Sequence, residues 1–508
     1  MIAIGIPINQ NINLFPSSLP LLDTSLQIEA LNQKFEESNC SRPEPIGQSV
    51  VDLCVPLSPM ELPRLSETLL FARSRIAPID GLGDGAVEAE RTTSVPPLDE
   101  QFTAVRSLSR QLSATLSDGD ATAQSMPDAS PAKWHLAHST WFFETFVLRD
   151  FLPGYCAYDD RFGFLFNSYY DAEGERHARD KRGLLTRPSI GKVRAYRDHV
   201  DAAIIDAYPI LPSKARVLLE LGCQHEQQHQ ELLLTDVLHL FAANPLLPAL
   251  FAPTEPAPQK ANPLLWIEGR TGVVEIGSDG EGFAFDCEGP RHSTFLTPHA
   301  LASRPVSNNE WANFILDGGY DDPRFWLSEG WAWVRGNSID APLYWQRGFD
   351  GGWSQFSLSG LHPVALNAPV SHISFFEADA YARWVGARLP TESEWESAAA
   401  QYAPLDGNLL DRAGAIAPRP PKNSDSGLQQ LYGDVWEWTG SAYRPYPGFA
   451  PAASAVGEYN GKFMSSQFVL RGGSCATPRG PVRASYRNFF APHQRWQFSG
   501  VRLAKDLG

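Results

Sequence analysis

Four stretches with helical spacing of apolar residues follow one another between residues 97 and 250, and they constrain the fold more than any other feature of the chain. The first is LDEQFTAVRSLSRQLSATL, in which apolar side chains recur every three or four residues, as on one face of an amphipathic helix. The others are SPAKWHLAHSTWFFETFVLRDFL, SIGKVRAYRDHVDAAIIDAY and ARVLLELGCQHEQQHQELLLTDVLHLFA. Four such helices so close in sequence predict an antiparallel bundle, whose interior can hold a metal ion bound by facing helices.

The rest of the chain has a different composition. Of the 14 tryptophans, 12 lie between Trp266 and Trp496, among many Gly-Gly and Pro-Gly turns. Helical spacing is rare here, with one clear helix in SFFEADAYARWVGA and a short one in TESEWESAAA. This pattern predicts a second, loop-rich domain with short strands.

These shifts in composition predict the domain boundaries. The bundle occupies residues 97–250, the proline-rich stretch APTEPAPQKANP gives a linker at residues 251–263, and the second domain covers residues 264–506. Residues 1–95 mix short apolar runs with Pro, Ser and Gly without a sustained period, so we predict a disordered or weakly folded extension there.

Net charge and cysteine usage disfavour several classes of function. The formal charge of the 508 residues is −16, which argues against a nucleic-acid partner or an anionic membrane surface. The six cysteines are scattered without a CxxC pair, so neither a disulfide framework nor a zinc ribbon is indicated. The first basic residue is Lys34, and no run of about 18 apolar residues occurs, so we expect neither a secretory signal nor a membrane span and place the protein in the cytoplasm.

The fourth helical stretch contains His-Glu-Gln-Gln-His, the motif of zinc proteases. Successive residues of an α-helix turn by about 100°, so His225 and His229 lie on one face and can bind one ion. A protease would use Glu226 as general base and would need a third metal ligand downstream. No HxxGxxH continuation follows, Glu231 lies on another face, and Glu255 falls in the proline-rich linker, so a protease is disfavoured.

A third imidazole can come from the second helical stretch, where WHLAH offers His135 and His138. Either residue could face the pair His225 and His229 across the bundle. Three imidazoles without a carboxylate leave open positions on iron, copper or zinc, and the ligand types alone do not choose among these metals. The alternative is that these histidines belong to the polar faces of ordinary helices.

Longer motifs carry a family resemblance. The stretches SPAKWHLAHSTWFFETFVL and HEQQHQELLLTD, followed by LYGDVWEWTGSAYRPYPGF and VLRGGSCATPRGPVRASYRNFF, closely resemble the ergothioneine-biosynthesis sulfoxide synthases. Those enzymes are non-haem iron proteins that join a DinB-like four-helix bundle to a formylglycine-generating-enzyme-like domain of the C-type-lectin-like α+β type. The resemblance covers residues 97–506 and implies an α+β multidomain fold of that architecture.

The resemblance also implies a cofactor and a reaction. In that family Fe(II) is held by one histidine of the LAH helix and two of the HxxxH helix, which here are His138, His225 and His229. His135 is then a neighbour, and Glu226 is an ordinary helix residue. The implied reaction joins the sulfur of a thiol to C2 of the imidazole of hercynine, consumes O₂ and leaves a sulfoxide.

Residues that contact the substrates are implied in the same way. Gln228 matches the glutamine that hydrogen-bonds the substrate imidazole, and Asn488 in YRNFF matches a contact to the substrate carboxylate. Tyr169 and Tyr170 match a Tyr-Tyr pair that one subgroup places beside the iron, as proton donors or reductants. The alternative is that both rings pack at the junction between the two domains.

The stretch RNFFAPHQR bears on the identity of the thiol donor. Members that use γ-glutamylcysteine carry an acidic and a basic residue where this chain has Phe490 and Gln494. Two charged contacts are missing, and Phe489 and Phe490 narrow the pocket, so we expect cysteine as the donor and γ-glutamylcysteine as the less favoured one. Among three neighbouring arginines, Arg179 is the residue that we expect at the donor carboxylate.

Two other functions compete with this one. An ovothiol-type sulfoxide synthase would act at C5 of histidine; its usual appended methyltransferase does not follow the final VRLAKDLG, which favours the ergothioneine branch. The second alternative is a non-catalytic DinB-like binding module. Five matched positions argue against that module, namely His138, His225, Gln228, His229 and Asn488.

Overall fold

The computed structural model describes residues 96–253, 262–348, 351–421, 427–451, 457 and 460–508. The extension predicted at residues 1–95 lies outside the described residues, as does most of the predicted linker. The described residues all belong to one compact unit, Arg91–Gly508.

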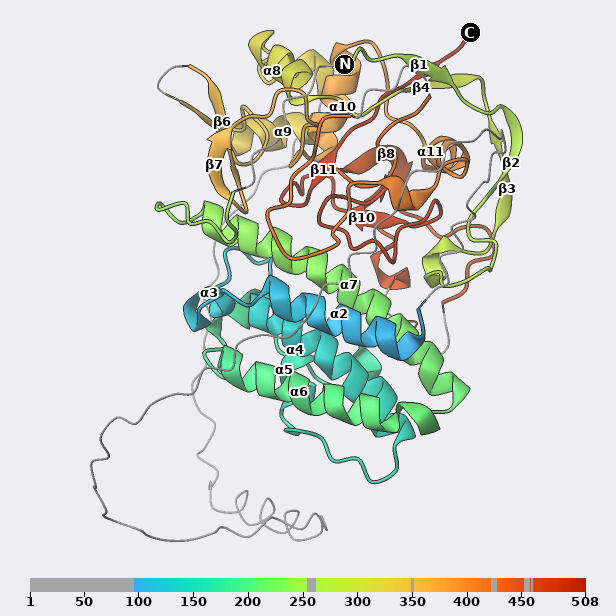
Figure 1. The fold of residues 1–508 in the computed structure, drawn as a ribbon. Helices are drawn as coiled ribbons and strands as arrows, with labels where there is room; N and C mark the ends of the chain where they lie inside the picture. Colours follow the sequence, from blue (N-terminus) through green and yellow to red (C-terminus); the bar gives the residue numbers. More distant parts are fainter. Residues whose placement is uncertain (1–95, 254–261, 349–350, 422–426, 452–456, 458–459) are drawn as a thin grey trace, which may run out of the picture. The chain divides into compact units, whose positions relative to one another are not determined.

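Four helices form the bundle predicted from the first half of the sequence (Figure 1). They are α2 (Leu98–Leu112), α4 (Ala132–Phe143), α6 (Ile190–Ala207) and α7 (Ser213–Ala242), with the short helices α3 (Asp118–Thr122) and α5 (Phe162–Phe166) between them. α4 packs against α6 and α7, and α2 packs against α7. Their apolar faces meet in one hydrophobic core, so the predicted bundle is confirmed.

Local sequence explains where these helices begin and how closely they approach. The Ser189 side chain accepts a hydrogen bond from the Lys192 backbone N–H and caps the start of α6. Gly222 of α7 lies so close to Phe143 of α4 that an added Cβ would collide with the phenylalanine ring. Glycine at this position therefore lets the two helices that carry the histidines pack tightly.

Short strands in small sheets build the described part of the second half. One sheet has the order β10-β9-β8-β11 and another the order β1-β4-β12, and β2-β3 and β5-β6-β7 form two more. The strands are β1 (Trp266–Glu268), β2 (Gly272–Ile276), β3 (His292–Leu296), β4 (His299–Ala302), β5 (Trp345–Arg347), β6 (Trp353–Ser357), β7 (Gly360–Pro363), β8 (Trp436–Ala442), β9 (Phe468–Arg471), β10 (Asn488–Phe490), β11 (Ser499–Gly500) and β12 (Ala504–Asp506).

Helices α8 (Asn308–Leu316), α9 (Ser328–Gly336), α10 (Phe375–Trp384) and α11 (Glu392–Ala399) accompany these strands. α10 and α11 are the two helices that the sequence predicted, and each begins with a capping box, in which a Ser or Thr and a Glu satisfy the first backbone N–H groups. The mixture of helices and short strands confirms the predicted α+β class. β10 lies at the edge of its sheet, with Asn488 opposite Leu470 and Phe490 opposite Phe468.

Helix α7 lies along the boundary between the bundle and the second half (Figure 1). Three of its side chains form hydrogen bonds with the second half: Gln228 with Tyr486, Glu231 with Trp436, and Asp236 with Trp496. The helix that carries the HxxxH motif therefore also anchors the strand-containing half of the protein.

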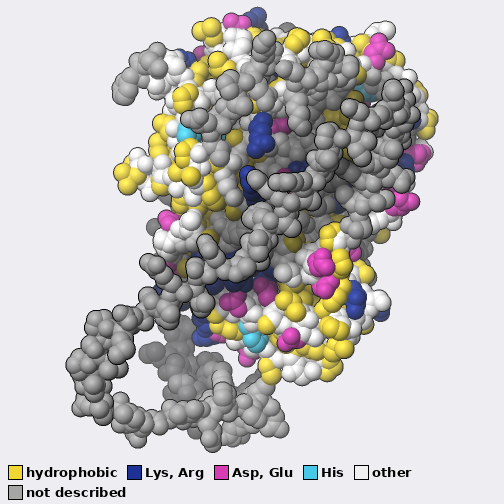
Figure 2. All heavy atoms as spheres, viewed as in Figure 1, with side chains coloured by type: hydrophobic (Ala, Val, Ile, Leu, Met, Phe, Trp, Pro, Cys, Tyr) yellow, Lys and Arg dark blue, Asp and Glu magenta, His cyan; other side chains and the backbone are white. Residues whose placement is uncertain are grey.

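Acidic and basic side chains are interspersed over the described residues on the face drawn in Figure 2. None of the described helices is long and apolar enough to cross a membrane. The 30-residue helix α7 carries histidines, glutamates and glutamines along its length.

Candidate metal centre and substrate pocket

Three buried histidines from two helices converge inside the bundle. His138 comes from α4, and His225 and His229 come from successive turns of α7. Their ligand nitrogens lie within 4.8 Å of one another, and their ring centroids are 4.6 to 5.0 Å apart. Each histidine thus offers one nitrogen to a shared point, where a metal ion could be held.

Aromatic neighbours hold these imidazoles in place. His138 is sandwiched between Trp134, stacked at 4.6 Å, and Trp141, stacked at 5.6 Å, about one turn before and after it on α4. The Phe142 ring packs on His225 at 5.0 Å. Close packing of this kind restricts the rotamers of the histidines and keeps their surroundings apolar.

All three imidazoles are neutral at neutral pH. Burial and the neighbouring histidines lower the pKa of His138 and His229 well below the usual value, and burial lowers the pKa of His225 to about 4. His138 Nδ1 lies 2.6 Å from the Phe166 carbonyl oxygen. Because a carbonyl only accepts, Nδ1 carries the proton and Nε2 keeps the lone pair that a metal requires.

This donor set fits a divalent transition metal. Neutral imidazole binds iron, copper and zinc, and a set of three leaves coordination positions open for other molecules. Within the described ranges, His138, His225 and His229 are the single group of three or more His, Cys, Asp or Glu side chains placed to hold a metal ion.

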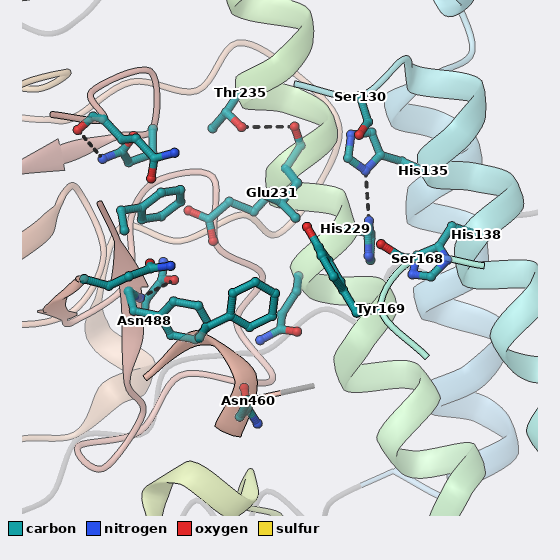
Figure 3. A pocket seen from close by; sticks show the side chains of 18 of the residues that line it. Ser130, His135, His138, Ser168, Tyr169, His229, Glu231, Thr235, Asn460 and Asn488 are labelled. Carbon is teal, nitrogen blue, oxygen red and sulfur yellow. Dashed lines mark hydrogen bonds between the residues drawn. The ribbon is translucent and has the colours of Figure 1, made fainter. Parts of the chain in front are cut away.

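His135 lies beside this trio. Its Nδ1 is 2.8 Å from His229 Nδ1 (Figure 3). Its Nε2 is 3.0 Å from Asp236 Oδ2. The WHLAH motif left open whether His135 or His138 is the third ligand. The structure favours His138, because its ring faces both α7 histidines, whereas His135 hydrogen-bonds to one of them.

Glu226, the glutamate of the HEQQH motif, is engaged in the bundle core. It accepts hydrogen bonds from Arg106 at 2.6 Å, Arg197 at 2.8 Å and Ser109 at 2.5 Å. Burial opposes its ionisation, but the two guanidinium groups and Ser109 hold the pKa of Glu226 at about 2. A carboxylate committed to two buried arginines is a poor general base, which removes the basis for a zinc-protease interpretation.

A cavity of about 190 Å³ lies between the histidines and the second half of the chain. Its bundle side includes Tyr169, Gln228 and the imidazoles of His135, His138 and His229; facing residues include Asn488, Phe489, Phe490, Gln494 and Trp496. Figure 3 shows the three labelled imidazoles on one side of the pocket and Asn488 on the other. The structure thus brings Gln228 of the bundle and Asn488 of the second half, both predicted from the sequence, into one pocket.

Tyr169 and Tyr170 lie in different surroundings. Tyr169 lines the cavity, and Arg179 Nη1 donates a hydrogen bond to its hydroxyl at 2.7 Å. Tyr170 is buried instead among aromatic rings of the bundle, with Trp141 at 5.5 Å and Phe146 at 5.2 Å. Of the two predicted tyrosines, Tyr169 is therefore among the residues that line the cavity and Tyr170 is not.

The three arginines after the tyrosines also differ. Arg176 pairs with Asp171 and is exposed, whereas Arg179 lines the cavity from an exposed position. Arg182 is 3% exposed, lines the cavity and stacks over Trp134 with its guanidinium 3.3 Å from the ring centroid. Burial and the nearby Arg179 lower the pKa of Arg182, and no carboxylate of the described residues forms an ion pair with it.

Two further residues contact this site: Arg182, one of the three arginines considered from the sequence, and Asp236, which was not predicted. Arg182 donates hydrogen bonds to Ser130 and Ser168 from a short 3-10 turn, which has no periodicity to reveal its burial. Asp236 contacts His135 through its carboxylate. Helical geometry could have found it, because seven residues after His229 amount to about two turns and return to the same face.

Two family models match the chain in the expected order. Residues 101–233 match the DinB superfamily, and residues 251–409 and 410–507 match the sulfatase-modifying factor enzyme 1-like domain. The first match falls on the helical bundle and the second on the strand-containing half. The exact boundaries given above remain predictions.

Relatives in bacteria and yeast match long stretches of the chain. Hercynine oxygenase of Mycobacterium tuberculosis is 34% identical over 415 residues, which is 77% of this chain and 94% of that protein. Hercynine oxygenase of Mycolicibacterium smegmatis is 36% identical over 417 residues, again 77% of this chain and 94% of that protein. Ergothioneine biosynthesis protein 1 of Schizosaccharomyces pombe is 28% identical over 239 residues, which is 44% of this chain and 28% of that protein. Because the two bacterial oxygenases are matched over nearly their whole length, the chain belongs to the hercynine oxygenase family.

Proposed function

We propose that this protein is an iron(II)- and O₂-dependent sulfoxide synthase that joins the sulfur of cysteine to C2 of the imidazole of hercynine, giving hercynylcysteine sulfoxide for ergothioneine biosynthesis. The observation that carries this proposal is the convergence of three neutral imidazoles, two of which, His138 and His229, line a cavity whose other side offers Asn488 and aromatic rings. A ferrous ion held by His138, His225 and His229 would supply the one-electron chemistry that O₂ requires. Cys223, Cys287 and Cys475 are buried thiols, which supports our placement of this activity in the cytoplasm.

Gln228 is positioned to bind the substrate imidazole. Its Nε2 lies 2.9 Å from the Tyr486 hydroxyl, which orients the amide. Its Oε1 is buried and accepts no hydrogen bond from the described residues. A buried acceptor without a donor is costly, so an imidazole N–H of hercynine in the cavity would satisfy it.

The opposite side of the cavity suits the amino-acid end of hercynine. The backbone N–H of Phe489 donates to Asn488 Oδ1, which leaves the Asn488 NH₂ group as the donor for a carboxylate. Phe490 and Trp496 meet edge to face at 5.6 Å and line the same cavity. Aromatic faces attract a quaternary ammonium group without forming a salt bridge, so this wall supports binding of the trimethylammonium group.

Tyr169 is the residue that we assign to proton delivery, with Tyr170 reassigned to packing. Because Arg179 donates to the Tyr169 oxygen, the phenol is oriented and its own O–H is the proton that it can transfer. We assign the carboxylate of the thiol donor to Arg182 together with Arg179, since both guanidinium groups line the cavity.

The donor side supports cysteine over γ-glutamylcysteine. Phe490 and Gln494 both line the cavity, and Gln494 Oε1 is occupied by the Ala491 backbone N–H at 2.8 Å. Neither side chain offers a charge to the additional amino and carboxylate groups of γ-glutamylcysteine.

Restoring two charges is expected to shift the donor preference. The double variant Phe490→Asp with Gln494→Arg should raise kcat/KM for γ-glutamylcysteine relative to cysteine by about tenfold or more, because a hydrogen bond to a charged group contributes about 1.5–3 kcal/mol. Phe490→Asn with Gln494→Met opens similar space without charge and is the matched control. An unchanged ratio in the charged variant would remove the argument for cysteine that rests on these two positions.

The proposed reaction is tested by anaerobic reconstitution with Fe(II), followed by hercynine, cysteine and O₂, and mass spectrometry of the product. We expect the mass of hercynylcysteine sulfoxide together with O₂ uptake. A product formed from histidine and sulfurised at C5 would support the ovothiol-type alternative. Absence of O₂ uptake with any histidine derivative would leave the binding module.

A further inference from the structure

We propose that Asp236 and His135 form a positioning relay that fixes the tautomer of His229, so that Nδ1 of His229 carries a proton and Nε2 is the nitrogen available to the metal. This inference rests on the proposed metal site and extends it to two residues outside the ligand trio. The relay runs from the carboxylate through one imidazole to the next, over contacts of 3.0 Å and 2.8 Å.

The carboxylate end of the relay is fixed as an acceptor. The backbone N–H of Ser130 donates to Asp236 Oδ2 at 2.7 Å, and the indole N–H of Trp496 donates to Oδ1 at 3.0 Å. Both groups can only donate, so each oxygen of Asp236 is already an acceptor. His135 Nε2 approaches Oδ2 at 3.0 Å and must therefore donate its own N–H.

The direction of the second hydrogen bond follows from the first. A neutral imidazole has one donor and one acceptor nitrogen, so His135, which donates through Nε2, accepts through Nδ1. The partner at 2.8 Å is His229 Nδ1, which then carries the proton and donates it. The reverse direction would place the proton of His229 on Nε2 and remove the lone pair from the metal site.

His138, another proposed ligand, also donates its Nδ1–H to a fixed acceptor, but the acceptor is a different group. His138 donates through Nδ1 to the Phe166 carbonyl, so its tautomer is fixed by the main chain. His229 is oriented by side chains, and the partner of the carboxylate, Trp496, belongs to the second half of the chain. Metal ligands are commonly oriented by such outer partners, and loss of a partner costs about 10–100-fold in metal affinity or activity.

The test compares His135→Phe, which has no acceptor for His229, with His135→Gln, whose amide can accept from His229 and donate to Asp236. We measure the dissociation constant for Fe(II) by anaerobic titration of the full chain. His135→Phe is expected to weaken Fe(II) binding by about 10–100-fold, and His135→Gln is expected to restore most of that loss. The control is His239→Phe, which makes the same exchange on α7 at a histidine bonded to Ser125 and should leave the dissociation constant unchanged.

A second readout reports the tautomer without metal. ¹⁵N spectra of histidine-labelled apoprotein, assigned with a His229→Ala spectrum, should show the Nδ1–H form of His229 in the wild type and in His135→Gln. In Asp236→Leu that form should be depleted, because a side chain without an acceptor no longer holds the proton of His135 on Nε2. This near-isosteric variant also decides the matter if His135→Phe does not fold.

Two results would overturn the relay: an Nε2–H form of His229 in the wild-type apoprotein, or equal Fe(II) affinities in the wild type and a folded His135→Phe. Failure of the proposed iron-dependent function would give a different result from failure of the relay. In that case the wild-type protein binds no Fe(II), while the ¹⁵N spectrum still reports whether Asp236 and His135 set the tautomer.

Discussion

Replacing His138 by alanine is expected to abolish iron retention and turnover together. In the proposed site His138 is the ligand from α4, and its ring centroid lies 5.0 Å from that of His225 and 4.8 Å from that of His229. Two imidazoles from one helix cannot replace the missing third donor. Because loss of an outer partner already costs about 10–100-fold, loss of a ligand should cost at least about 100-fold in Fe(II) affinity. Metal analysis after desalting and O₂ uptake with hercynine and cysteine measure both effects.

His135→Ala provides the comparison on the same helix. This variant removes the imidazole of His135 and leaves His138, His225 and His229 in place. A water molecule that enters the space can accept a hydrogen bond from His229. Iron binding should weaken, and measurable turnover should remain. If His135→Ala were inactive and metal-free while His138→Ala kept its iron, the ligand from α4 would have been assigned to the wrong histidine.

Replacing Glu226 by alanine is expected to give the largest loss of stability. The change leaves the guanidinium groups of Arg106 and Arg197, both buried, without the carboxylate that they share. Breaking a buried ion pair by removing one partner costs about 3–5 kcal/mol, which should appear as a lower midpoint of urea unfolding. Asp198→Ala is the control, because Asp198 and Arg110 form an exposed pair and such pairs contribute about 0–1 kcal/mol.

This prediction also separates the structural role of Glu226 from a catalytic one. A metalloprotease would lose peptide hydrolysis in Glu226→Ala with little change in the free energy of unfolding, and that outcome would contradict the role assigned here. The pH dependence has a defined sign. The pKa of Glu226 is lowered from 4.5 to about 2 in the folded protein, so its contribution is complete above about pH 4.5 and is lost as the pH falls toward 2.

Helical periodicity and short-range spacing predicted the bundle and the metal-binding face. The i, i+4 pair His225 and His229 is a local property of α7, so it follows from the helix alone. The choice of His138 over His135 needed either the resemblance or the structure, because both residues lie on one helix and either could face α7.

The rest of the site depends on contacts that local sequence does not encode. Gln228 meets Tyr486 across 258 residues, and Trp496 meets Asp236 across 260. Tyr169 and Tyr170 are adjacent in an irregular segment, where no repeat predicts which ring faces the cavity and which is buried. Such segments are the places where sequence patterns are least informative.

X-ray absorption spectroscopy of the iron-reconstituted protein tests most directly whether imidazoles from α4 and α7 bind one ferrous ion. We predict one iron per chain with scattering from three imidazole ligands in the wild type, and loss of the bound iron in His138→Ala. A first coordination shell with fewer than three imidazoles in the wild type, or an unchanged spectrum in His138→Ala, would contradict this prediction.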